Sequence, residues 1–110
     1  MADITLTPES ISRSGLEATY TGSLSTGNTY FVANNENTFL HFKKSGAGDC
    51  DVTIVTSATV LGYAVSDVVV TVPASTGDVF IGPFPKAVFG ANITFTADEI
   101  TGLTVACLRL

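Results

Sequence analysis

The first residue to consider for chemistry is His41, because a general base or a nucleophilic triad would have to be built on the only histidine of the chain. It lies between Leu40 and Phe42 in an apolar run, and the 110 residues contain no GxSxG elbow. A metal ion would need partners that the sequence does not offer. We therefore assign His41 a structural or surface role, and we predict that the protein is not an enzyme.

The acidic residues also lack the spacing that chemistry requires. Asp49 and Asp51 follow the turn Gly46–Gly48, but the spaced ligands and final Glu of a calcium loop are missing, as is the Lys-Ser/Thr of a phosphate loop. Asp98 and Glu99 are adjacent in sequence, so they do not resemble the opposed carboxylates of a glycosidase. These segments are predicted to be exposed turns, and we predict no catalytic residue, metal or cofactor.

The two cysteines, Cys50 and Cys107, belong to no CxxC motif and have no second cysteine or histidine beside them. Zinc binding and thioredoxin-type redox chemistry are therefore disfavoured. Cys107 alternates with Val105 and Arg109 along an apolar run, which is typical of a small buried thiol. We favour reduced core cysteines, while a disulfide between the two remains an alternative.

Composition limits the classes of partner. Only 14% of residues are charged, well below the roughly 25% of ordinary soluble domains, and the mean hydropathy is +0.41. Part of the apolar surplus is therefore expected to face another protein, as in a homo-oligomer. A net charge of −5 with five cations disfavours nucleic acid as a partner. The sequence has no polybasic anchor, no spanning apolar run and no signal-like start, so we expect no membrane partner and a start in the cytoplasm of the cell that makes it.

The positioning elements are predicted to be strands. In the central block Val68–Thr96, three apolar runs alternate in side-chain direction and are separated by turns at Pro73, Gly77, Pro83, Pro85 and Gly90. Eight to ten short strands and no long amphipathic helix predict an all-β, single-domain antiparallel sandwich, jelly-roll or Greek-key-like, over residues 1–110.

The remaining strands are predicted around Ile4 and Leu6, and over Leu16–Tyr20, Gly27–Ala33, Thr38–Lys44, the CDVTIVT segment that begins at Cys50, and Leu103–Leu110. Ala58–Ser66 reads either as a short strand or as a crossover loop between sheets. Residues 1–15 are polar and loosely patterned, and they are a candidate N-terminal arm that orders on a partner. Tyr20, Tyr30 and Tyr63 are scattered among segments and there is no Trp, which favours packing over a sugar-stacking platform.

Three segments carry a resemblance to a known family: TVPASTGDVFIGPF at Thr71–Phe84, ITFTA at Ile93–Ala97 and the ending LTVACLRL at Leu103–Leu110. They are similar to small accessory head proteins of tailed bacteriophages, over roughly Tyr30–Leu110. The resemblance implies a decoration or cement protein, a β-sandwich that binds the outside of the major capsid protein lattice as a dimer or trimer. It implies a location on the capsid surface of the virion.

The family motifs are structural, so the resemblance transfers no catalytic residue. The interface candidates are three phenylalanines around the central turns and two residues at the last strand, namely Phe80, Phe84, Phe89, Arg109 and Leu110. Core packing is the alternative for each phenylalanine. A head–tail connector or tail-associated virion component is one competing function, and a carbohydrate-binding β-sandwich module is another.

Overall fold

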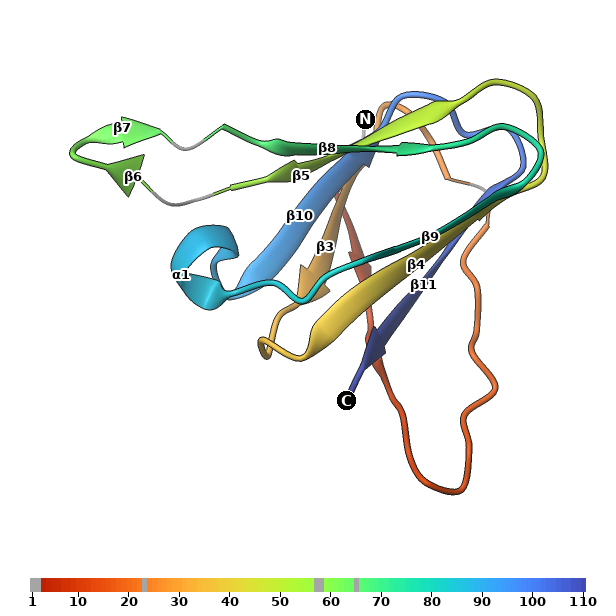
Figure 1. Ribbon diagram of the computed structural model, residues 1–110, viewed down its shortest axis with the longest axis horizontal. Coiled ribbons are helices and arrows are strands. Elements are labelled where there is room, and N and C mark those ends of the chain that lie inside the picture. Colours follow the sequence, from red (N-terminus) through yellow and green to blue (C-terminus); the bar gives the residue numbers. More distant parts are fainter. Residues whose placement is uncertain (1–2, 23, 57–58, 65) are drawn as a thin grey trace.

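The structure, a computed structural model, describes residues 3–22, 24–56, 59–64 and 66–110, and it is built from two facing β-sheets (Figure 1). The first sheet has the order β1-β3-β10-β5-β8, formed by β1 Asp3–Leu6, β3 Thr29–Ala33, β10 Asn92–Ala97, β5 Cys50–Val55 and β8 Val68–Val72. The second has the order β2-β11-β4-β9, formed by β2 Glu9–Ser10, β11 Leu103–Arg109, β4 Thr38–Lys44 and β9 Gly77–Ile81. A two-stranded hairpin, β6 Thr59–Val60 and β7 Tyr63–Ala64, and the short helix α1 Lys86–Phe89 complete the chain. The predicted all-β sandwich is confirmed.

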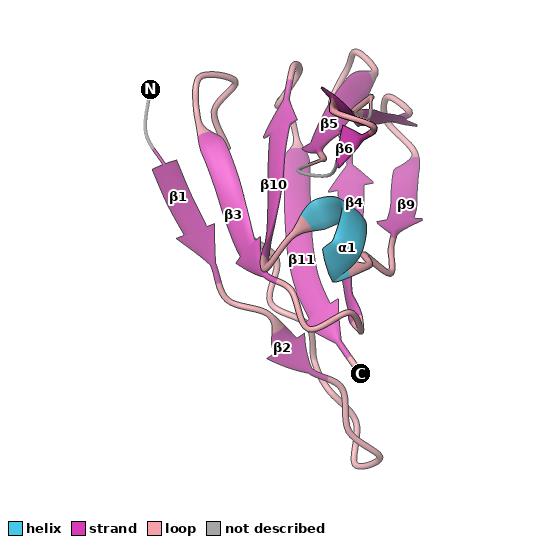
Figure 2. Ribbon diagram, turned by 90° about the vertical axis from the view of Figure 1, so that its left-hand side faces the viewer, coloured by secondary structure: helices cyan, strands magenta, loops and turns pink. Residues whose placement is uncertain are grey.

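Two strand pairs are parallel, in contrast to the predicted antiparallel arrangement. β1 runs parallel to β3 at the edge of the first sheet, and β2 runs parallel to β11 at the edge of the second. The chain leaves β1 at Leu6, passes the buried Pro8 and continues in the same direction to Glu9, so it adds one edge strand to each sheet (Figure 2). The other pairs within both sheets are antiparallel.

The core lies between the sheets and follows the alternation of the sequence. Along β5 and β10 every second side chain is buried, as expected for strands with one face against a second layer. The Phe95 ring lies 5.2 Å from that of Tyr30 in a stacked arrangement and 5.4 Å from that of Phe42 at an interplanar angle of 88°. Because Phe42 belongs to the opposite sheet, this aromatic cluster joins the two layers.

The central block forms the three predicted strands, β8, β9 and β10, with one addition. The sequence PKAVFG folds into the four-residue helix α1, which begins after Pro85 and ends at Gly90 with a φ of 82°. In β8 only Val72 is buried, while Val68 is 40% and Val69 58% exposed. Since β8 is an edge strand with a neighbouring strand on one side only, the predicted alternation is not matched by burial there (Figure 1).

The predicted strand at Leu16–Tyr20 is wrong, because these residues belong to a long loop, residues 11–28, between β2 and β3. The edge of β11 is already occupied by β2 at its end, and the loop reaches that edge only through a bridge between Thr21 and Val105. Residues 3–6 and 9–10 of the candidate N-terminal arm pair with the two sheets, and residues 1–2 lie outside the described part of the chain.

The segment that reads either as a strand or as a crossover loop, Ala58–Ser66, is a hairpin over its described part. β6 and β7 pair across a turn at Leu61 and Gly62, and the hairpin projects beyond the sandwich in the same direction as β5 and β8 (Figure 1). Positions 58 and 65 lie outside the described residues. We call residues 55–69 the hairpin arm.

Candidate functional site

His41 is the centre of a polar cluster that the sequence did not reveal. It lies in β4, is only 7% exposed, and its Nδ1 lies 2.8 Å from the Tyr20 hydroxyl while its Nε2 is hydrogen-bonded to Asp78. A neutral ring with its proton on Nε2 donates to the carboxylate and accepts from the phenol, so both ring nitrogens are satisfied. Tyr20 and Asp78 are 21 and 37 positions away in sequence, and spacing alone could not have identified them.

Strand register explains how the cluster forms. Phe80 of β9 is the Cα partner of His41, and their rings stack with centroids 3.9 Å apart at an interplanar angle of 6°. The bridge from Thr21 to Val105 holds Tyr20 near β4. The Tyr20 hydroxyl is bonded to Nδ1 of the histidine ring, and Asp78 is bonded to Nε2. The hydrogen bond with His41 lowers the pKa of the Asp78 carboxyl below its usual value of 3.8.

The polar groups of the cluster are hydrogen-bonded to one another, so we assign the cluster a positioning role. His41 has a partner at each nitrogen, and the described residues contain no buried side-chain nitrogen or oxygen without a hydrogen bond. Within the same described ranges, no group of three or more His, Cys, Asp or Glu side chains is arranged to hold a metal ion. The cluster fixes the rings of Tyr20 and Phe80 at the surface of the second sheet.

A polar groove of about 540 Å³ lies beside the cluster and includes Tyr20 and Asp78 in its lining. Lys43 Nζ lies 5.5 Å from the centroid of the Tyr20 ring, a cation–π distance. Lys44 is 2% exposed, and its ammonium group donates to the carbonyl of Thr101. The two lysines are therefore engaged by the protein's own groups.

The interface candidates separate into surface and core. Phe80 is 62% exposed and Leu110 75% exposed, and both line an apolar groove of about 370 Å³. We call this surface the apolar groove, and its lining is formed by Asn37, Phe39, Phe80, Ile81, Gly82, Pro83 and Leu110. Sequence reasoning identified two of these residues without placing them together.

Phe84 and Phe89 pack into the core instead, which is the alternative that the sequence left open for them. Phe84 is 2% exposed and contacts the partly buried Phe89 at 84° with ring centroids 5.1 Å apart. The Nε of Arg109 donates to the Ser10 hydroxyl at 3.0 Å and so connects β11 to β2. Neither phenylalanine presents a fully exposed ring to a partner in this structure.

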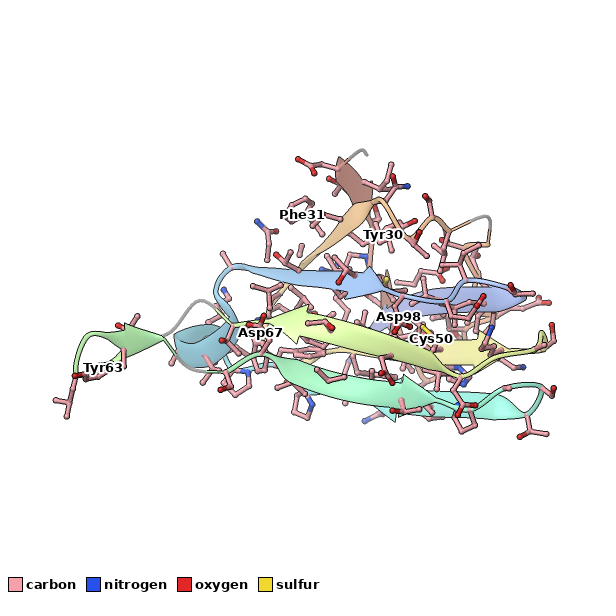
Figure 3. All side chains as sticks on the ribbon, turned by 90° about the horizontal axis from the view of Figure 1, so that it is seen from above. Tyr30, Phe31, Cys50, Tyr63, Asp67 and Asp98 are labelled. Atoms are coloured by element: carbon pink, nitrogen blue, oxygen red, sulfur yellow. The ribbon has the colours of Figure 1, made fainter. Side chains whose placement is uncertain are left out.

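The hairpin arm carries half of the large exposed apolar side chains of the described chain. At its tip Leu61 is 93% and Tyr63 77% exposed, and at its base the exposed side chains are Val55, Val68 and Val69. Figure 3 shows Tyr63 at the far end of the hairpin, well separated from the sandwich. Such a concentration of exposed apolar groups is typical of a contact surface.

The long loop carries the remaining exposed apolar side chains, Ile11, Leu16 and Tyr20. Every residue from Ile11 to Glu17 is exposed, and the loop descends from the sandwich on the side away from the hairpin arm (Figure 1). The loop is anchored at its end, where the Thr19 amide donates to Glu9 at 2.8 Å and Thr21 bridges to Val105. Irregular connections of this length are uncommon in small domains and are often functional.

Both cysteines are free and buried, in agreement with the favoured sequence interpretation. Burial raises the pKa of the Cys107 thiol to about 12 and also raises that of Cys50. A thiol with a raised pKa carries little thiolate at neutral pH, so neither cysteine is a candidate nucleophile. The three tyrosines also do not form a common platform, because Tyr30 is buried in the core while Tyr20 and Tyr63 belong to the long loop and the hairpin arm.

Comparisons of the chain with protein-family models, with curated proteins and with solved structures found no match. No helix in the described ranges is long and apolar enough to cross a membrane.

Proposed function

We propose that this chain is a structural virion protein that binds and stabilises the outer surface of a tailed-phage capsid, as a decoration or cement protein. The observation that carries the proposal is the distribution of the ten large exposed apolar side chains. All of them lie on three surfaces: the long loop, the hairpin arm and the apolar groove, of which the loop and the groove adjoin at His41 through Tyr20 and Phe80. The proposed partners are the major capsid protein and further copies of this chain, in a dimer or trimer.

A cement protein must contact several neighbours at once, and exposed apolar surfaces on different parts of one chain suit that task. Apolar contact contributes roughly 25 cal/mol for each Å² removed from water. A sandwich whose core is already packed loses little conformational freedom on binding, which leaves more of this free energy for affinity. The resemblance of Thr71–Phe84 and Leu103–Leu110 to phage accessory head proteins is the reason for proposing the capsid as the partner.

We place the capsid contact on the first part of the long loop, Ile11–Glu17. The candidate arm of residues 1–15 includes strands β1 and β2, which pair with both sheets and are needed by the fold. The exposed residues that follow them have fewer contacts with the sandwich. Leu16, which is 37% exposed, is one of the two large exposed apolar side chains of this segment.

The test is the number of copies bound by heads assembled without this chain. Purified protein is titrated onto such heads, and the bound copies are counted by quantitative mass spectrometry after the unbound protein is removed. Saturation at on the order of hundreds of copies, spread over the symmetric lattice, is the expected result. Leu16→Asp is expected to weaken binding at least tenfold, whereas Thr26→Asp, an exposed position later in the same loop, is the matched control.

Binding confined to one vertex would contradict the decoration proposal and favour a connector or tail-associated component. Absence of binding to heads would also overturn it and favour the carbohydrate-binding alternative. Equal binding of Leu16→Asp and Thr26→Asp would leave decoration in place but refute the loop as the capsid contact.

A further inference from the structure

The hairpin tip combines two unfavourable features. Leu61 and Gly62 occupy the turn between β6 and β7 with φ values of 53° and 82°, a pair of left-handed residues as in a type I′ turn. Asn or Gly usually fills the first of these positions, because a left-handed conformation costs a residue with a Cβ about 1–2 kcal/mol. Leu61 adopts it and is also 93% exposed. An exposed, left-handed leucine contributes little to the isolated fold.

The apolar groove is a fixed hollow on the same chain. The Phe80 ring stacks on His41 and lies 6.3 Å from the ring of Phe39, and the hydrogen bonds of His41 to Tyr20 and Asp78 hold that histidine in place. The exposed Leu110 lies at the same groove. Because its aromatic lining is already ordered, the groove loses little side-chain entropy when it receives an apolar group.

The tip and the groove lie on different parts of one molecule. The hairpin extends outward from one end of the sandwich, while the C-terminal residue at the groove lies at the lower edge (Figure 1). A contact between the two surfaces is therefore a contact between copies. It is head to tail, because the tip of one copy meets the groove of the next, and such contacts form closed rings when the rotation allows it.

Charge favours this pairing of surfaces. Each copy has a net charge of −5, so most contacts between two copies bring like charges together. Thr59–Ser66 contains no Asp, Glu, Lys, Arg or His side chain, and neither does the lining of the apolar groove. The tip and the groove can approach each other without bringing two charged side chains into contact.

We propose that the hairpin tip of one copy, through Leu61 and Tyr63, inserts into the apolar groove of a second copy. An aromatic side chain buries about 150–250 Å², whereas stable interfaces bury roughly 1,200–2,000 Å² in total. A single tip-in-groove contact is therefore weak, and association depends on protein concentration or on ring closure. This inference specifies the homo-oligomer part of the proposed function, but it is tested without capsids, so either can fail alone.

The experiment is sedimentation velocity over a wide range of concentrations, on wild type and on Leu61→Asp and Leu110→Asp. One variant changes the tip and the other changes the groove, and both positions are so exposed that the fold should be kept, as checked by circular dichroism melting. Each variant is expected to associate at least tenfold more weakly, where tenfold corresponds to about 1.4 kcal/mol. Ser66→Asp is the matched control, because it adds the same charge to an exposed position of the hairpin arm away from the tip.

The decisive sample is an equimolar mixture of the two variants. The intact tip of Leu110→Asp meets the intact groove of Leu61→Asp, so the mixture is expected to form dimers and no larger species. A wild type that stays monomeric at the highest concentration would overturn the inference. So would a mixture that stays monomeric, or a Ser66→Asp variant that loses association as fully as Leu61→Asp.

Discussion

The sandwich body and the hairpin arm differ in how far their large apolar side chains are buried. In the body, large side chains such as Tyr30, Phe42 and Phe95 are almost fully buried between the sheets, and the buried polar groups of His41 have hydrogen-bond partners. In the arm, Leu61 and Tyr63 project into solvent. The body buries most of its large apolar side chains and leaves few exposed outside the apolar groove, whereas both large apolar side chains of the arm's tip are uncovered. The buried side chains of the body set the fold, and the exposed side chains of the arm are, with the long loop and the apolar groove, the surfaces that we propose contact other molecules.

The largest expected difference between the two regions is the loss of stability when one of their apolar side chains is truncated. Phe95→Ala removes a ring that contacts both Tyr30 and Phe42 and should lower the free energy of unfolding by about 3–5 kcal/mol. Leu61→Ala removes a side chain that is 93% exposed and should change it by less than about 0.5 kcal/mol. The free energy of unfolding of each variant is measured by urea unfolding followed by circular dichroism. A Leu61→Ala loss as large as that of Phe95→Ala would show that the tip packs against the body.

A smaller effect concerns the polar cluster of the body at low pH. The hydrogen bond from His41 lowers the pKa of Asp78 from 3.8, so this contact stabilises the folded state above pH 3.8. Its contribution is lost as the pH falls through the lowered pKa. We expect His41→Phe, which keeps a ring against Phe80, to return the Asp78 pKa toward 3.8.

The measurement for Asp78 is a carbon-13 NMR titration of its carboxyl group. Tyr20→Phe is the matched control, because it removes the other partner of His41 and should leave the Asp78 pKa low. Equal Asp78 midpoints in wild type and His41→Phe would contradict the assigned hydrogen bond. Midpoints that rise equally in His41→Phe and Tyr20→Phe would mean that the hydrogen bond between His41 and Asp78 depends on the hydrogen bond between Tyr20 and His41.

Much of the body could be predicted from the sequence, because its strands carry a strong local pattern. The alternation of Ile93 and Phe95 with threonines matches the burial in β10, whereas in β11 the run Val105–Leu108 is buried on both faces. At Leu16–Tyr20 the local composition favours a strand, but the long loop pairs with the edge of β11 only through Thr21 and Val105. Local composition does not report which edges are taken.

The candidate surfaces were harder to predict, because they depend on pairings distant in sequence. Phe80 and Phe84 belong to the same apolar stretch, but Phe80 lies in β9 opposite His41 and is exposed, whereas Phe84 lies after the end of β9 and is buried. The cluster around His41 joins residues from three separate segments. The Leu61–Gly62 pair was the one local signal for the hairpin tip, since a glycine between two short apolar runs is typical of a tight turn.

Amide hydrogen exchange of the protein, free and bound to heads, tests most directly whether the exposed apolar surfaces are its contact surfaces. We predict that peptides covering the hairpin tip, residues 59–64, and the first part of the long loop, residues 11–17, become protected on the head. Peptides of β10 in the core should exchange slowly and equally in both states. Unchanged exchange in the tip and the loop, with new protection confined to other surfaces of the sandwich, would contradict the account.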